Sequence, residues 1–82
     1  MATAEEIIDS INYLLEDPAL QKNIKAKLEQ INGILKGANK KDARLKADKC
    51  IDILSEVCDD VNIQSFVRTQ LFQISGMLES IE

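Results

Sequence analysis

The sequence predicts an all-α fold, a four-helix bundle built from two repeated antiparallel helical hairpins. Four segments carry apolar residues at the three- and four-residue spacing of one helix face, and residues typical of caps and turns separate them. Residues 50–79 also align with residues 7–36 without a gap, with nine identities in thirty positions and an offset of 43 residues. These observations predict two copies of one helix–turn–helix unit.

The first helix is expected to begin at Thr3, which starts a T-x-x-E capping box with Glu6. Asp17-Pro18 should end this helix, because the residue before a proline is disfavoured in the helical conformation. Its apolar positions are Ala4, Ile7, Ile8, Ile11, Leu14 and Leu15.

The second helix is predicted from about Leu20 to Lys36. Gly37 follows it, and a glycine just past a helix end commonly adopts the left-handed conformation. We therefore expect Gly37 to end the helix in that conformation. The apolar stripe of this helix is Ile24, Leu28, Ile31 and Leu35.

The third helix is predicted from about Asp42 to Cys58 and the fourth from Ile63 to Ile81, with a turn at residues 59–62 between them. The third helix has its apolar face at Ala43, Ala47, Cys50, Ile51, Leu54, Val57 and Cys58. The fourth has its apolar face at Ile63, Val67, Leu71, Ile74, Leu78 and Ile81.

A period of about 40 residues with two helices in each copy is typical of HEAT and armadillo arrays. Such arrays need about three or more copies to cover their apolar faces, whereas this chain has two. The hairpins, residues 3–36 and 42–81, are therefore expected to pack on each other as one domain over residues 1–82. A homodimer that completes the surface is the alternative.

Length and composition are those of one small helical domain, with 82 residues, 45% apolar and 29% charged. The N-terminal segment lacks the pattern of a signal peptide, and no run of about 18 apolar residues occurs. We expect a soluble, cytoplasmic protein without membrane association. Cys50 and Cys58 lie about 12 Å apart along one predicted helix, too far for a disulfide, and we expect both to be buried.

Charge is unevenly distributed along the chain. Residues 22–49 hold nine basic and three acidic residues, although the whole chain has a net charge of −4. Lys40, Lys41 and Arg44 gather at the start of the third helix, where the helix dipole is already positive, and they form a candidate anion-binding site. A nucleic-acid-associated protein that uses the basic region 36–49 is therefore one functional hypothesis.

The second hairpin carries apolar residues on its outward side where the first is polar. Phe72 and Ile53 stand where the first copy has Glu29 and Ser10. Phe72 lies beside Thr69 and Gly76 on the helical wheel, and a glycine within a helix costs about 1 kcal/mol relative to alanine. Because a close approach by another helix would explain that cost, we predict a surface for a protein partner or for self-association. We assign Phe72, Thr69, Gly76 and Ile53 to it.

The sequence gives little support to catalysis. It contains no histidine, and so no side chain with an unperturbed pKa between about 5 and 8. No motif provides a nucleophile with its base, a phosphate-binding loop or a metal cluster. The paired acids Glu16-Asp17 and Asp59-Asp60 are more typical of helix ends and turns than of metal ligands. We therefore expect no enzymatic activity, no cofactor and no metal.

Residues across the second hairpin resemble a small family of archaeal all-helical proteins that is classed as an uncharacterised protein family. The residues that carry this resemblance are Ile53-Leu54, Glu56, Asp60, Asn62, Arg68-Thr69, Phe72, Ile74, Leu78 and Glu79. The resemblance covers nearly the whole chain and implies a compact four-helix domain in the archaeal cytoplasm. It implies no function. Arg68 joins the predicted partner surface, because Arg68-Thr69 carries the resemblance and lies beside Phe72. The alternative for Arg68 is an ion pair with an Asp or Glu near the turn at residues 59–62.

The sequence therefore favours a non-enzymatic protein-interaction module that acts through the second hairpin. The alternative is nucleic-acid association through the basic region. The two differ in chemistry, because binding to a nucleic acid is sensitive to salt.

Overall fold

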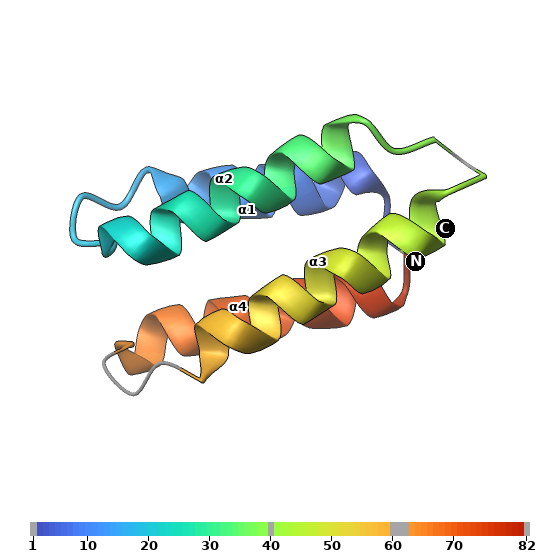
Figure 1. Ribbon diagram of the computed structural model, residues 1–82. Helices are drawn as coiled ribbons and strands as arrows, with labels where there is room; N and C mark the ends of the chain where they lie inside the picture. Colours follow the sequence, from blue (N-terminus) through green and yellow to red (C-terminus); the bar gives the residue numbers. More distant parts are fainter. Residues whose placement is uncertain (1, 40, 60–62, 82) are drawn as a thin grey trace.

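A computed structural model describes residues 2–39, 41–59 and 63–81 as an all-α structure with four helices. The helices are α1 (Ala4–Leu15), α2 (Lys22–Lys36), α3 (Ala43–Cys58) and α4 (Ser65–Glu79). In Figure 1, α1 and α2 form the upper layer, and α3 and α4 form the lower layer. The helices run alternately up and down the long axis of the molecule.

The four helices close on one another. Each contacts the next along the chain, and α1 also packs against α4, which completes the ring of contacts. The apolar stripe of every helix thus faces a common core. Two hairpins stacked as an open array would leave α1 and α4 apart, so the expected compact four-helix arrangement is confirmed.

Among the described residues, the core consists of aliphatic side chains with one thiol, Cys50, and one buried amide, Asn32, and it contains no aromatic ring. At 25 cal/mol per Å² or so of apolar surface removed from water, this burial is the main force that holds the helices together. The largest fully buried side chains are Ile7, Ile11, Leu14, Leu28, Ile31, Leu35, Cys50, Leu54, Leu71, Ile74 and Leu78.

Both ends of α1 follow the sequence prediction. The Thr3 hydroxyl oxygen accepts a hydrogen bond of 3.2 Å from the Glu6 backbone N–H, and the Thr3 hydroxyl in turn lies 3.3 Å from the Glu6 carboxylate. After α1 ends, the Asp17 carboxylate accepts a 2.9 Å hydrogen bond from the Ala19 backbone N–H. This contact stabilises the turn at Pro18.

The predicted helices α2 and α4 were too long. The structure places extended N-cap residues at Gln21 and Gln64, so α2 begins at Lys22 and α4 at Ser65. Leu20, Ile63 and Ile81 lie outside the helices but remain buried. Apolar periodicity therefore continued past the helix ends, because these residues cover the ends of the core. Ala2 also forms an isolated bridge with Ile81, which brings the two described ends of the chain together (Figure 1).

The prediction for Gly37 was wrong, because Gly37 has right-handed dihedral angles, φ −88° and ψ −1°. Lys46 explains how the helix end is satisfied without a left-handed residue. Its ammonium donates a 2.9 Å hydrogen bond to the Gly37 carbonyl and lies 3.5 Å from the Asp42 carboxylate. The turn predicted at residues 59–62 falls mostly outside the described residues, and only Asp59, the C-cap of α3, is described.

Candidate interaction surfaces

The predicted partner surface falls largely on α4. Phe72 is 59% exposed and points outward, as the helical wheel predicts. Thr69 and Gly76 are exposed on the same helix, and Arg68 is half-buried. The Thr69 hydroxyl donates a 3.0 Å hydrogen bond to the Ser65 carbonyl, so it is turned back onto its own helix. Phe72, Thr69, Gly76 and Arg68 together are called the α4 surface.

Ile53 does not join the α4 surface. It is half-buried and packs against the core. Ile53 precedes Glu56 by one helical turn, and Glu56 lies 3.6 Å from Lys27 of α2. Ile53 thus lies on the flank of α3 that faces α2, whereas the opposite flank faces α4. A helical wheel gives a residue's angle but not which neighbouring helix covers it, which is why the prediction failed here.

The two internal glycines have open space around them. A methyl group added at Gly33 or at Gly76 would meet no atom within 4 Å beyond its own helix backbone. No other described part of the chain therefore approaches either glycine closely. If the close approach predicted at Gly76 exists, it involves a second molecule.

The cysteines differ in environment. Cys50 is fully buried, and burial raises the pKa of its thiol to about 11. Cys58 is only half-buried, which corrects the expectation that both are buried. Burial also raises the pKa of the Cys58 thiol, and the nearby Arg68 partly offsets that shift. Both thiols are protonated at neutral pH and so are poor nucleophiles.

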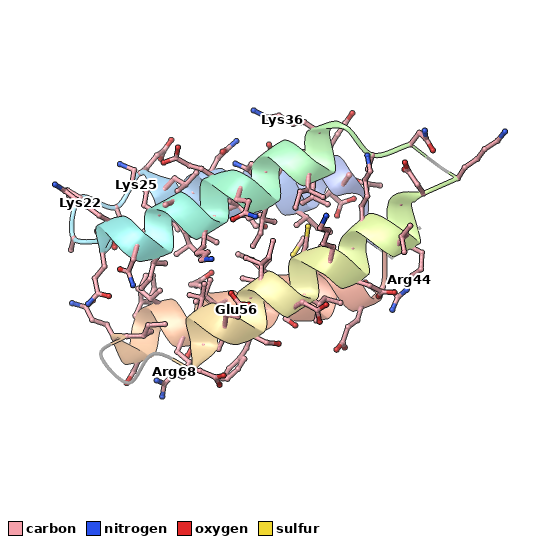
Figure 2. The ribbon with its side chains drawn as sticks, in the orientation of Figure 1. Lys22, Lys25, Lys36, Arg44, Glu56 and Arg68 are labelled. Carbon is pink, nitrogen blue, oxygen red and sulfur yellow. The ribbon has the colours of Figure 1, made fainter. Side chains whose placement is uncertain are left out.

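The candidate anion site is partly engaged within the protein. Arg44, labelled in Figure 2, donates a 2.7 Å hydrogen bond to the Glu79 carbonyl at the end of α4. Its guanidinium also lies 3.1 Å from the Asp48 carboxylate. The guanidinium therefore joins α3 to α4. Lys41 is exposed, and Lys40 lies outside the described residues. Lys41 and Arg44 are close in the sequence, but no contact of the described structure joins their side chains into one site.

Other basic side chains extend into solvent. Figure 2 shows Lys22, Lys25 and Lys36 along α2, directed away from the bundle. These three lysines, with Lys41 and Lys49, are exposed and form no ion pair with the described part of the chain. The basic residues lie on both flanks of α2. Lys27 lies 3.6 Å from Glu56 of α3, whereas helical spacing places Lys25 and Lys36 on the side of α2 that carries Asn32, which contacts α1. They do not form one stripe.

The structure has a second exposed surface, between α1 and α4, which the apolar pattern of the sequence did not indicate. Tyr13 of α1 is 67% exposed, and Phe66 of α4 is 53% exposed. They flank an open hollow of about 260 Å³, which Leu14, Glu16 and Asp17 also line. The repeat could have indicated this surface. It aligns Tyr13 with Glu56 and Phe66 with Asn23, so each aromatic residue stands where the other copy has a polar one. These residues and the hollow are called the α1–α4 groove below.

The described residues contain neither a metal-ligating cluster nor a membrane-spanning helix. No cluster of three or more metal-ligating side chains occurs within residues 2–39, 41–59 and 63–81. In the same ranges, every helix falls short of the length and apolar character needed to span a bilayer.

Comparisons with known proteins identify the fold. The model of an uncharacterised protein family, UPF0147, matches residues 1–81. A crystal structure of MMP1188, a protein of unknown function, superposes with a TM-score of 0.87 at 23% identity, over 96% of this chain and 89% of that one. At that identity the likeness concerns the fold alone. A comparison with curated proteins found no match.

Proposed function

We propose that this chain, which belongs to the uncharacterised protein family UPF0147, is a non-enzymatic module that binds another protein. Family membership supplies no activity, so the proposal rests on the geometry. It assigns binding to the α4 surface, with Phe72 as the anchor and Thr69, Gly76 and Arg68 around it.

One observation carries the proposal, namely that every aromatic side chain of this protein is exposed. The chain has one tyrosine, two phenylalanines and no tryptophan. Tyr13, Phe66 and Phe72 are 67%, 53% and 59% exposed. A single exposed apolar residue is ordinary. Here, however, the core contains no aromatic residue and all three aromatic side chains are exposed. Aromatic residues are enriched in protein interfaces, so this distribution supports a binding role.

Phe72 and Gly76 together give the α4 surface the features of a helix-docking site. The ring offers a large apolar contact, and the glycine one turn later leaves room for a backbone to approach. The first copy of the repeat has Glu29 in place of Phe72. The same helix position is thus apolar in one hairpin and charged in the other, which supports a specific role for the second.

The test compares Phe72→Lys with Leu45→Lys as bait in affinity purification from the native cell, with and without nuclease. Leu45 is 73% exposed on α3 and belongs to neither surface, so it controls for adding a lysine at an exposed apolar site. We expect Phe72→Lys to lose a partner that the parent and Leu45→Lys retain, and the partner to survive nuclease. Light scattering after size exclusion follows self-association in the same three proteins.

The proposal fails if Phe72→Lys has the partners and oligomeric state of the parent. It also fails if both lysine variants lose the same partner, because the loss would then come from the added positive charge and not from the position of Phe72 on α4.

The second candidate is nucleic-acid association, favoured by the five exposed basic residues that make no ion pair in the described chain. The net charge of −4 opposes it. It predicts binding to RNA or DNA at low ionic strength that weakens steeply as salt rises, and that weakens further on substitution of Lys40, Lys41 and Arg44. Partners lost on nuclease treatment would favour this candidate over protein binding.

We also infer that the two hairpins are copies of one unit of 43 residues, with a HEAT-like period. Several features support this. Helices α2 and α4 each have 15 residues and begin after a glutamine N-cap with nearly the same dihedral angles, φ −64° and ψ 145° at Gln21 and φ −65° and ψ 145° at Gln64. Equivalent core residues Leu28 and Leu71 are both fully buried. Outward positions that differ between copies are then the places to seek function.

We propose an archaeal cytoplasmic location as part of the same hypothesis. Its support is the resemblance of the second hairpin to a family of archaeal proteins. The free cysteines add no support, because the spacing of Cys50 and Cys58 on α3 by itself prevents a disulfide between them.

A further inference from the structure

We infer that the α1–α4 groove is a second binding site, which takes an arginine side chain from a basic segment of a partner protein. This inference rests on the proposed class of function, protein binding, but uses a surface separate from Phe72. The groove shares no lining residue with the α4 surface, so either site can exist without the other.

The position of the groove follows from how α1 meets α4. Ser10 and Tyr13 lie one turn apart on the same flank of α1, and the Ser10 hydroxyl contacts the Met77 sulfur of α4 at 3.7 Å. That contact fixes this flank of α1 toward α4. Because the two helices are antiparallel, the end of α1 then lies beside the beginning of α4, where Phe66 stands. Tyr13 of α1 and Phe66 of α4 thereby line one hollow between the two helices.

The groove has an apolar floor and two aromatic walls. Leu14 at the floor is 1% exposed and belongs to the core. The volume of about 260 Å³ is below the range of roughly 300 to 1,000 Å³ typical of small-molecule sites. It therefore suits one protein side chain better than a cofactor. Exposed aromatic rings attract cations through their electron-rich faces.

Charge selects the occupant. Glu16 and Asp17 line the groove, and none of the basic residues within 2–39, 41–59 and 63–81 does. Both acids follow the last turn of α1, where the helix dipole is already negative and where α1 has no basic side chain. Acids in this position are electrostatically unfavourable for the isolated helix. A cation bound beside them would gain from the carboxylates and from the dipole together.

Arginine matches this combination best. Its planar guanidinium stacks on aromatic rings, and its fork of N–H donors fits a carboxylate. One oxygen of Asp17 already accepts from the Ala19 backbone N–H, which holds the carboxylate in place and leaves its other oxygen to accept from a ligand. Glu16 is exposed and can turn toward the groove. A second copy of the chain fits less well, because symmetric pairing of this face would bring like charges together.

The test uses a short Gly/Ser peptide that carries two arginines, together with the same peptide made with neutral citrulline. Each is titrated into the ¹⁵N-labelled full chain at low salt. We expect the arginine peptide to move the amide signals of Tyr13, Glu16 and Phe66, and the citrulline peptide to move none. We expect Tyr13→Ala, Phe66→Ala and the double variant Glu16→Gln/Asp17→Asn each to weaken binding by about fivefold or more.

Matched controls separate the groove from general attraction to an acidic protein. Glu5→Gln/Asp9→Asn removes the same charge from exposed positions of α1 outside the groove. Leu45→Ala removes an exposed apolar side chain from α3. Both should bind the arginine peptide as the parent does. Asn at position 17 keeps an oxygen for the Ala19 N–H, and circular dichroism verifies that each variant is folded.

Three results would overturn the inference. Equal loss in both charge-neutralising doubles would mean non-specific electrostatic attraction. Equal binding of the citrulline peptide would mean that no cation is recognised. Concentration-dependent self-association that Phe66→Ala abolishes would make a second copy the occupant. None of these results bears on Phe72, and a failure of Phe72→Lys to lose a partner would leave the peptide titration unaffected.

Discussion

At the scale of single residues, the least expected contact is between two asparagines. Asn32 is the buried polar residue of the described core, 6% exposed, and its side-chain N–H donates a 2.8 Å hydrogen bond to the Asn12 side-chain oxygen. The Asn32 side-chain oxygen has no partner in the described structure. The pair joins α1 to α2, and its half-satisfied amide costs stability relative to an apolar contact.

This arrangement predicts opposite effects at its two ends. Asn12→Ala should lower the free energy of unfolding by about 1 to 2 kcal/mol, because it leaves a buried N–H without a partner. Asn32→Leu should be neutral or stabilising, because exposed Asn12 can bond to water instead. Urea unfolding followed by far-UV circular dichroism measures both. A larger loss for Asn32→Leu than for Asn12→Ala would contradict this account.

Single residues also mark the limits of sequence reasoning about the site. The exposure of Phe72 was predictable, because its angle lies far from the apolar stripe of α4. Ile53 and Cys58 were not, because both lie at the edges of a stripe, where burial depends on how the next helix packs. Asn32 was missed for the same reason. Asn32 comes directly after Ile31, at the edge of the apolar stripe of α2. It is buried because α1 packs over that edge, which the sequence of α2 does not show.

At the scale of helices, the equivalent glycines provide a controlled comparison. Gly33 in α2 and Gly76 in α4 lie on exposed surfaces with open space at the missing methyl group. Gly33→Ala and Gly76→Ala should therefore each raise the free energy of unfolding by about 1 kcal/mol, through helix propensity alone. Thermal unfolding by circular dichroism checks both values.

The same two variants separate stability from binding. If a partner helix approaches α4 closely, Gly76→Ala should weaken partner capture although it stabilises the fold. Gly33→Ala should leave capture unchanged. If both variants capture the partner equally well, Gly76 does not belong to the α4 surface.

Helix number and order were predictable from the sequence, whereas the starts of α2 and α4 and the end of α4 were not. Thr3 and Pro18 set the ends of α1 through local chemistry that a sequence displays. The starts of α2 and α4 lack a side-chain cap, and apolar residues continue beyond them. Leu20 and Ile63 are buried by the tertiary fold rather than by a helical turn, so periodicity alone extended both helices.

At the scale of the whole molecule, the contact of α1 with α4 decides the architecture. A repeat in the sequence does not determine whether two hairpins form an open array or a closed bundle. Closure also brings Ala2 to Ile81. The four helices therefore surround one core, and the two described ends of the chain meet. The fold should form from the same helices even when the chain ends are moved to another connection.

A circular permutant tests this expectation. A short Gly/Ser linker would join the original ends, and new ends would open in the connection at residues 37–42. We expect the helical content of the parent and a loss of stability on the order of 1 kcal/mol, because loop-closure entropy changes slowly with length. The contrast is the first hairpin alone, residues 3–36, which should show no cooperative unfolding because its apolar stripes lack the second layer. A cooperatively folded single hairpin would show that the core is not shared.

The exposed tyrosine of the α1–α4 groove has a practical consequence. Tyr13 is the only tyrosine, and the chain has no tryptophan. When tyrosine is excited selectively over the two phenylalanines, ultraviolet emission from this protein therefore originates at one side chain, which is 67% exposed when the chain is folded. The emission should change little when the bundle melts and more when something enters the groove. The protein carries its own optical probe, one that reports occupancy of that groove rather than folding.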